Sequence, residues 1–332
     1  MDKSGMKRRP LLALGLFSAV AAGLPHGRVL AQASAWPQRP IRIVVGFPAG
    51  TSPDLMARVL AEPLAQALGQ PVIVENRVGA SGSIGAEAVA KASDGHTFGL
   101  IGNAALTSNP ILNPKLPYSV KDFKPITVVG SAPLLVVAAN SVKFDTPAEF
   151  FREARSAGAR WNYGSVGVGS GTHLGNELLK AKAGFDAVHI PFNGVPAILA
   201  AMIAGDVQMA TLPIGAALAQ VNGGRIKGVA LTSASRSILA PNIPALPEAG
   251  VPALGIELWN AVMAPASTPK PVLDLFSRAV TKVIRSDEMR QKLFLQGWRA
   301  DGTSPESLER RIKDDTALYA EIIALRKITV SS

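Results

Sequence analysis

Two loops rich in small residues carry the side chains that could bind or react with a small molecule. The first lies in the segment 46–58, GFPAGTSPDLMAR. Ser52 suits the N-cap of a helix, Pro53 its first position, and the charge of Asp54 its first turn. Open N–H groups at a helix start attract anions, although the same residues also make an ordinary turn. The candidate ligand-binding residues here are Phe47, Ala49, Gly50, Thr51, Ser52 and Asp54, and we interpret Asp54 as structural rather than as a general base.

The second loop, 163–174, reads YGSVGVGSGTHL and is expected to join a strand to a helix. It lacks the third glycine of a dinucleotide-binding fingerprint and the Gly-Lys-Ser/Thr of a phosphate loop. A hydrolase that uses Ser170 and His173 is an alternative, but no strained Gly-x-Ser-x-Gly elbow in the right context supports it. The candidate ligand-binding residues in this loop are Ser165, Gly167, Gly169, Ser170, Thr172 and His173.

Two further loops follow predicted strands, and ligands bind at such strand ends in open parallel sheets. They contribute the candidates Asn103 and Ala104 and the candidates Phe192 and Asn193, although Phe192 could equally pack in the core. The chain contains no cysteine, and His96, His173 and His189 have no mutual ligand spacing. We therefore expect no metal site, no cofactor and no catalytic residue.

Short β-branched runs alternate with longer helical patterns, which predicts an α/β fold with parallel sheets covered by helices on both faces. Strands are expected at 41–46, 72–75, 97–101, 126–129, 134–139, 161–164, 188–190, 207–212, 226–232 and 256–264. Helices are expected at 54–68, 84–92, 147–156, 170–183, 196–204, 215–221, 271–285, 287–296 and 305–327.

The C-terminal helices have no sheet of their own, so we expect them to pack on the first group of strands. The chain then crosses between two lobes twice, near 137–141 and near 258–263. Two crossings make a hinge, as in proteins that close around a ligand. We predict that lobe 1 comprises 34–137 plus 262–332 and that lobe 2 comprises 138–261.

Residues 1–33 have the layout of a cleaved secretory signal: Lys3 and Lys7 to Arg9, an apolar run from Leu11 to Leu24, and a small-x-small site ending at Ala33. The apolar run is shorter than the roughly 20 residues of a membrane-spanning helix. Arg8-Arg9 is compatible with twin-arginine export, and the general route stays open. We predict a periplasmic protein whose mature chain begins near Ser34.

The composition is that of a folded globular protein, with 48% hydrophobic and 17% charged residues. The leader holds five basic residues and one acidic residue, so the formal charge of +10 falls to +6 after cleavage. A mild basic excess favours anionic ligands. With 5% aromatic residues and no basic block, we expect no nucleic-acid partner.

Taken in order, these segments resemble the tripartite tricarboxylate transporter receptors, the Bug-type periplasmic solute-binding proteins. The resemblance covers essentially all of 34–332. The segments that carry it are Trp36 to Arg42, Phe47 to Arg58, Val74 to Arg77 with Gly79, Ile84 to Glu87, Tyr163 to Ser165 through His173-Leu174, His189 to Pro191, Pro196-Ala197, Leu246 to Gly250, and Trp259 with Ala264-Pro265.

The resemblance implies a type II periplasmic-binding fold whose first two loops grip a ligand carboxylate through backbone groups and ordered waters. It also implies that a monomeric receptor delivers the ligand to the permease subunits of a tripartite transporter. A sensory receptor for a membrane signalling partner is an alternative that the sequence does not separate from transport.

Three positions depart from the family pattern. The usual double glycine of the first loop is Gly50-Thr51, the usual Tyr-Lys-Gly is Phe192-Asn193-Gly194, and the usual acid after Gly-x-Val is Gln208. Thr51 could narrow the pocket or add a hydroxyl donor. The ligand is therefore expected to differ from the simplest dicarboxylates.

Overall fold

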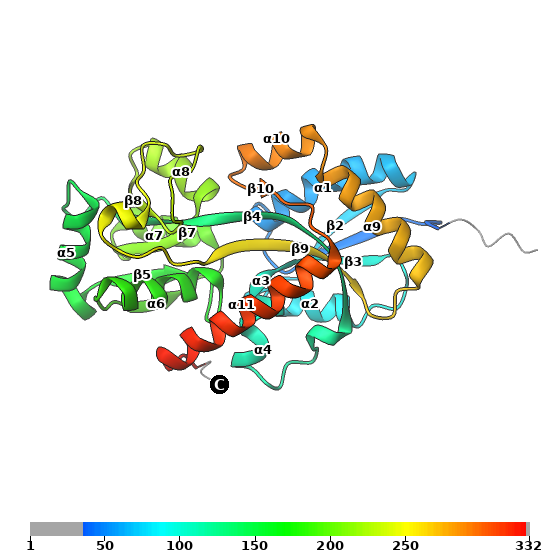
Figure 1. Cartoon of the computed structure of the whole chain (residues 1–332), viewed down its shortest axis with the longest axis horizontal. Helices are drawn as coiled ribbons and strands as arrows, with labels where there is room; N and C mark the ends of the chain where they lie inside the picture. The colour runs from blue at the N-terminus through cyan, green and yellow to red at the C-terminus, as the bar shows by residue number, and fades with distance from the viewer. Residues whose placement is uncertain (1–35, 330–332) are drawn as a thin grey trace, which may run out of the picture. The chain divides into compact units, whose positions relative to one another are not determined.

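A computed structural model of the chain describes residues 36–329, so the expected leader, 1–33, lies outside the described residues. The fold is a ten-stranded mixed sheet with helices packed on it (Figure 1). The strands are β1 (Ile41–Val45), β2 (Val72–Asn76), β3 (Thr97–Gly102), β4 (Phe123–Ala139), β5 (Asn162–Ser165), β6 (Val188–Pro191), β7 (Met209–Pro213), β8 (Ile226–Leu231), β9 (Glu257–Pro265) and β10 (Arg299–Ala300). The α/β class is confirmed.

The sheet order is β2-β1-β3-β9-β4-β7-β5-β6, with β8 and β10 also paired to β4. β1 is parallel to β2 and β3, and β5 is parallel to β6 and β7. The central strands β4 and β9 run antiparallel to each other and to their other partners. The expectation of parallel sheets is therefore wrong at the centre, where the two parallel groups are joined.

One strand, β4, belongs to both groups and joins the two strands that the sequence predicts at 126–129 and 134–139. It pairs with β9 as far as Pro133 and with β7 and β8 from Leu134 onward. A proline lacks the N–H that a strand interior needs, and Pro133 lies where the partner changes. Figure 1 shows β4 and β9 as two long neighbouring strands that connect the groups. β4 therefore changes its pairing partners at Pro133, and the crossing expected near 137–141 stays a prediction.

The helices flank these strands. They are α1 (Ser52–Leu68), α2 (Ser83–Ala90), α3 (Asn103–Leu106), α4 (Ser108–Leu112), α5 (Pro147–Ala157), α6 (Gly171–Ala183), α7 (Val195–Ala204), α8 (Ile214–Asn222), α9 (Lys270–Ile284), α10 (Asp287–Leu295) and α11 (Pro305–Leu325), with 3-10 turns at η1 (Ala80–Gly82), η2 (Val120–Asp122), η3 (Gly158–Arg160) and η4 (Leu246–Ala249). Over residues 36–329, none of these helices has the length and apolar run needed to cross a bilayer.

The first helix begins at Ser52, two residues before the expected start at 54. Thr51, not Ser52, is the extended N-cap residue, and its carbonyl accepts the N–H of Leu55 at 2.9 Å. Pro53 lies in the first turn, where its missing N–H costs nothing. The helix ends at Gly69, whose φ of 70° is the left-handed conformation that glycine adopts without strain. The N-cap, the proline and the glycine thus determine where α1 begins and ends.

The last helix, α11, packs on both groups of strands. Leu308 and Ile312 are buried with Trp259 and the β1–β3 elements. Tyr319, Ile322 and Ile323 are buried with the core of the β5–α6 region. Full burial of such side chains contributes about 1.5–3 kcal/mol each. The prediction that this tail packs on the first group alone is therefore wrong for its C-terminal end.

Candidate functional site

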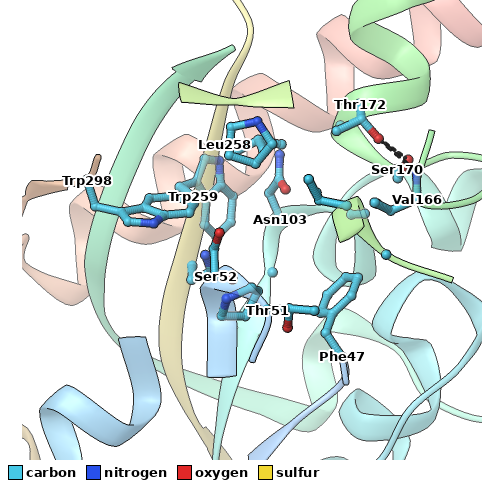
Figure 2. Close-up of a pocket in the computed structure, with 18 residues that line it drawn as sticks. Phe47, Thr51, Ser52, Asn103, Val166, Ser170, Thr172, Leu258, Trp259 and Trp298 are labelled. Carbon is cyan, nitrogen blue, oxygen red and sulfur yellow. Dashed lines mark hydrogen bonds between the residues drawn. The ribbon is translucent and has the colours of Figure 1, made fainter. Parts of the chain in front are cut away.

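A small cavity of about 80 Å³ lies where the carboxyl ends of strands from both groups meet (Figure 2). Five helices begin at its wall, and each follows a strand directly or after a short loop. The lining residues are Phe47, Thr51 to Pro53 at α1, Gly102 to Ala104 at α3, Val166 and Ser170 to Thr172 at α6, Gly194 and Val195 at α7, Pro213 at α8, Leu258 to Asn260 on β9, and Trp298.

The convergence of these helix starts favours an anion in the cavity, although no basic side chain lies in its wall. The first N–H groups of a helix have no acceptor within it, and the peptide dipoles add a partial positive charge there. Among the converging helices, α1 has 17 residues, α6 has 13 and α7 has 10. Such an arrangement binds a carboxylate or a similar anion.

The loop before α6 is held in shape by its own hydroxyl groups. The Ser170 hydroxyl donates to the Gly167 carbonyl at 2.7 Å and accepts the His173 N–H at 3.2 Å. The Thr172 hydroxyl accepts the Val166 N–H at 3.1 Å and lies 3.0 Å from the Ser170 hydroxyl. Figure 2 shows this Ser170–Thr172 pair at the cavity. The loop is therefore preorganised before any ligand arrives.

The loop before α1 is supported from beneath by Asp54, which is 1% exposed. Its carboxylate accepts the Gly50 N–H at 2.8 Å, two hydrogen bonds from Arg58 at 2.9 Å, and one from Asn76 at 2.9 Å. Burial pushes the pKa of Asp54 upward, but the hydrogen bonds from Arg58, Gly50 and Asn76 outweigh it and hold the pKa below its usual value. Asp54 is thus an ionised positioning group.

An aromatic wall completes the cavity. The Trp259 indole N–H donates to a carboxylate oxygen of Asp315 at 2.6 Å, which fixes the ring. Trp298 is 2% exposed and also borders a groove on the outside. Asn103, between the wall and the α6 loop, donates its amide to the Tyr319 hydroxyl at 2.9 Å. Sequence reasoning missed Trp259, Asn260 and Trp298 as site residues, because no local signal connects β9 and the segment after α10 with these loops.

The structure brings only some of the predicted site residues together. Those that line the cavity are Phe47, Thr51, Ser52, Asn103, Ala104, Ser170 and Thr172. Ala49 and Gly50 are exposed outside it, and Asp54 lies beneath the loop. Phe192 and Asn193 line a neighbouring hollow of about 380 Å³ together with Gly167.

Three more of the predicted residues, Ser165, Gly169 and His173, lie behind the wall of the cavity. Ser165 is 0% exposed and its hydroxyl lies 2.6 Å from a ring nitrogen of His189. The His173 and His189 rings are stacked with their centroids 4.0 Å apart. Burial lowers the pKa of His173 to about 3, with a smaller contribution from neighbouring charge. Burial also lowers the pKa of His189, to about 4. Both rings are neutral at physiological pH.

Next to the two histidines lies a buried ionic cluster. The Tyr163 hydroxyl donates to Glu177 at 2.5 Å, and Lys180 and Arg326 pair with the same carboxylate at 2.8 and 2.7 Å. Burial raises the pKa of Glu177, but the hydrogen bonds from Lys180, Tyr163 and Arg326 outweigh it and lower the pKa to about 2. Since Arg326 follows α11, the cluster ties the C-terminal helix to α6.

The side chains of Ser170 and His173, the pair named in the alternative hydrolase interpretation, form hydrogen bonds with the backbone of their own loop. The Nδ1 atom of His173 accepts the Gly169 N–H at 3.1 Å, and the Ser170 hydroxyl donates to the Gly167 carbonyl. Within residues 36–329, no three or more His, Cys, Asp or Glu side chains cluster in a way that could hold a metal ion.

Direct contacts also join the two groups of elements away from the cavity lining. The Ser81 hydroxyl donates to the Val168 carbonyl at 3.1 Å, and the Ser108 hydroxyl donates to the Gly169 carbonyl at 2.6 Å. On another side, Gly215 at the start of α8 packs against the backbone of Gln296 and Gly297 so closely that a side chain on either glycine would clash.

Comparison with known proteins gives consistent results. The profile of the tripartite tricarboxylate transporter family receptor matches residues 56–328. The chain is 33% identical to the protein BugT of Bordetella pertussis over 324 residues, covering 95% of this chain and 96% of BugT. Its fold is similar to that of R. palustris Rpa4515 with adipate, with a TM-score of 0.85, 29% identity, and coverage of 89% and 99%. It is also similar to the periplasmic binding protein BugD, with a TM-score of 0.82, 26% identity, and coverage of 89% and 99%.

Proposed function

Because this chain belongs to the tripartite tricarboxylate transporter receptor family, in which the receptors bind solutes, we propose that it captures a small carboxylate and delivers it to the permease subunits of such a transporter. The proposal rests on one observation: several helices begin at a single cavity whose wall has no charged side chain. A carboxylate placed there accepts hydrogen bonds from first-turn N–H groups of loops such as the one that Ser170 and Thr172 hold in shape.

Contacts between the two groups of elements support capture by closure. In this proposal lobe 1 (34–137 plus 262–332) supplies the α1 and α3 loops, and lobe 2 (138–261) supplies the α6, α7 and α8 loops. The Ser81–Val168 and Gly215–Gly297 contacts form when the lobes close. Exclusion of water then strengthens each hydrogen bond to the bound carboxylate.

The receptor binds its ligand without covalent chemistry. A serine nucleophile needs a base that accepts its proton. Here the Nδ1 atom of His173 accepts a backbone N–H, and the Ser170 hydroxyl caps α6. The better-aligned pair, Ser165 and His189, has its serine fully buried, where a substrate does not reach.

The location and partners complete the proposal. The secretory leader at 1–33 is removed on export to the periplasm by the twin-arginine or the general route. The mature receptor is a monomer that meets its permease there. The similarity to the periplasmic binding protein BugD supports this location.

A pair of matched cap variants tests the proposal. Ser170→Ala and Ser286→Ala each remove a hydroxyl that accepts an N–H at 3.2 Å, at the start of α6 and of α10 respectively. Each loses about 1 kcal/mol of stability. Only Ser170→Ala is expected to weaken carboxylate binding in isothermal titration. Equal binding by both variants, or turnover of a bound ligand that Ser170→Ala abolishes, would contradict the proposal.

The natural ligand can be sought directly. Protein purified from its host compartment is denatured, and the released small molecules are identified by mass spectrometry. We expect one carboxylate in near-stoichiometric amount. Release of a solute with no acidic group would contradict carboxylate capture.

A further inference from the structure

Two asparagine side chains are held in the cavity wall by neighbouring strands. Asn260 of β9 pairs with Gly102 of β3, and Asn103 follows Gly102 directly. The Oδ1 atom of Asn260 lies 3.4 Å from where a Cβ on Gly102 would be. Asn103 and Asn260 are 4% and 3% exposed, and both line the cavity. The pairing of β3 with β9 therefore places two buried amides in the same wall.

The Asn260 amide has no protein partner. Its side chain makes no hydrogen bond within residues 36–329. The side-chain atoms there that are both fully enclosed and unpartnered lie on other residues, namely His96, Asn176, Gln296 and Asp301. The Asn260 amide is thus not sealed in by protein and faces the cavity that it lines. Because a buried polar group without a partner costs free energy, a molecule in the cavity must satisfy it.

The Asn103 amide is only half satisfied. Its Nδ2 atom donates to the Tyr319 hydroxyl at 2.9 Å and lies 3.5 Å from the carbonyl oxygen of Glu257. Since a carbonyl oxygen only accepts, this contact identifies the nitrogen side of the amide. The Oδ1 atom accepts no hydrogen bond from the residues that the structure describes, and it is not fully enclosed. Asn103 therefore offers an acceptor to the cavity, and Asn260 offers both a donor and an acceptor.

The Asn103 amide lies next to the start of α6. Its Nδ2 atom is 3.7 Å from where a Cβ on Gly171, the first residue of α6, would lie. Figure 2 shows Asn103 between Trp259 and the Ser170–Thr172 pair. A carboxylate bound by the first-turn N–H groups of α6 thus has this amide close to the carbon atoms that follow it.

A hydroxyl group matches the two amides better than an amino group does. It donates one hydrogen, which the Oδ1 atom of Asn103 can accept, and it accepts one from the Nδ2 atom of Asn260. A protonated amine has no acceptor, and it brings a positive charge to helix starts that favour anions. An acid with neither group leaves the amides to water.

We propose that the ligand of this receptor is a hydroxycarboxylate with its hydroxyl on carbon 2 or carbon 3, and that Asn103 and Asn260 bind this hydroxyl and determine specificity for it. The inference rests on the proposed function and names the ligand class of the same site. It sets no limit on the length of the ligand or on its number of carboxylates, because Val166 borders both the cavity and the neighbouring hollows.

Pairs of acids that differ by one hydroxyl test the inference on the unaltered protein. The pairs are butanoate with 2- and 3-hydroxybutanoate, and butanedioate with 2-hydroxybutanedioate. We expect a hydroxy acid to bind about tenfold or more tightly than its parent in isothermal titration, and 2-aminobutanoate to bind no more tightly than butanoate. Hydroxy acids that bind no better than their parents would overturn the inference, because water would then serve the amides equally well.

The molecule released from the purified protein separates this inference from the proposed function. A hydroxycarboxylate of the stated kind supports both. A carboxylate with no hydroxyl on carbon 2 or carbon 3 overturns the inference and leaves the proposed function in place. A solute with no acidic group overturns both.

Replacement of Asn260 tests its role directly. Asn260→Leu keeps the approximate shape of the side chain but removes its donor and acceptor, and Asn260→Ala serves if the first variant does not fold. We expect the ratio of hydroxy-acid to parent-acid affinity to fall by about tenfold. Asn222→Leu, at the exposed end of α8 and outside the cavity lining, is the matched control and should keep the ratio. An unchanged ratio in a folded Asn260 variant, or an equal fall in the control, would overturn the role of Asn260.

The stability of the same variant distinguishes recognition from support of the fold. Asn260→Leu removes no hydrogen bond between described residues, so the midpoint of urea denaturation should not fall. Tyr319→Phe removes the partner of the Asn103 amide and should lower both the midpoint and the affinity ratio. A lower midpoint for Asn260→Leu with an unchanged ratio would show that the amide supports the fold and would overturn the inference.

Discussion

A ring nitrogen of His189 lies 2.6 Å from the hydroxyl oxygen of Ser165, and this buried pair lies behind the cavity wall. The Ser165 hydroxyl also accepts the Gly167 N–H at 3.1 Å. The histidine therefore supports the turn that presents the α6 loop. Neutral His189 next to neutral His173 is part of the folded structure, and this makes stability depend on pH.

Stability should fall as the solution becomes mildly acidic. The pKa values of His173 and His189 are about 3 and about 4 in the folded chain, below the ordinary value of 6.5. The unfolded chain therefore takes up protons first, so stability is complete above pH 6.5 and is lost toward pH 4 and below. Between pH 7 and pH 5 the loss is of the order of 2 kcal/mol per histidine.

Urea denaturation at both pH values measures this effect. His173→Asn, whose amide oxygen can replace Nδ1 as the acceptor for Gly169, should lose about half of the pH dependence. Glu177, whose pKa is lowered to about 2, contributes stability that is lost only below its ordinary value of 4.5, so it does not obscure this window. An equally steep dependence in the variant would exclude the histidines as its cause.

Asp54→Asn should destabilise the fold and weaken ligand binding together. The variant leaves Arg58 without its carboxylate and disturbs the acceptor for the Gly50 N–H. We expect a loss of about 1–3 kcal/mol, because Asp54 is buried but Arg58 is half exposed. Chemical denaturation measures the first effect and calorimetric titration the second.

Asp274→Asn is the matched control for that variant. Asp274 pairs with Lys270 at 2.7 Å on the exposed face of α9, and such pairs contribute at most about 1 kcal/mol. If the two variants lose equal stability, the support of the α1 loop by Asp54 is not the reason for the loss.

Gly215→Ala should weaken ligand binding and leave the fold intact. The added methyl would clash with the Gln296 carbonyl, so the close approach of α8 to the turn after α10 becomes impossible. We expect about tenfold weaker binding and a larger radius of gyration in the presence of ligand, measured by titration and small-angle scattering. Gly223→Ala, at the other end of α8 with a φ of −79°, should change neither quantity. Unchanged scattering and affinity in Gly215→Ala would refute the closure contact.

Export can be tested at the N-terminus. We expect protein from the periplasm to begin near Ser34, because the small-x-small site ends at Ala33. Edman sequencing or intact mass measures this directly. Periplasmic protein that retains Leu11 would contradict cleavage.

Much of the secondary structure could be predicted because its signals are local. Alternating apolar patterns predicted the strands of both parallel groups, and proline and glycine at the ends of α1 placed that helix within two residues. The short helices α3 and α4 were missed, since four or five residues are too few to show a periodic pattern. Antiparallel pairing of β4 and β9 was also missed, because strand partners far apart in sequence leave no local pattern.

The site was predictable where a loop leads into a helix. Ser170 and Thr172 were found from glycines and a cap, and both line the cavity. Ser165 and His173 lie in the same glycine-rich loop, but their side chains face the interior. Packing against His189 and Tyr163 sets the direction of these side chains. Trp298 enters the wall only because β10 pairs with β4. Which of these side chains touch a ligand stays a prediction.

The way α11 is anchored should limit how far the two proposed lobes can separate. Leu308 and Ile312 hold its beginning on one half of the molecule, and Tyr319 and Ile322 hold its end on the other. A hinge of two strands alone would swing freely. With α11 across the proposed hinge, a wide opening would pull aromatic and aliphatic side chains out of one core, so we expect the two proposed lobes to move apart only a short distance.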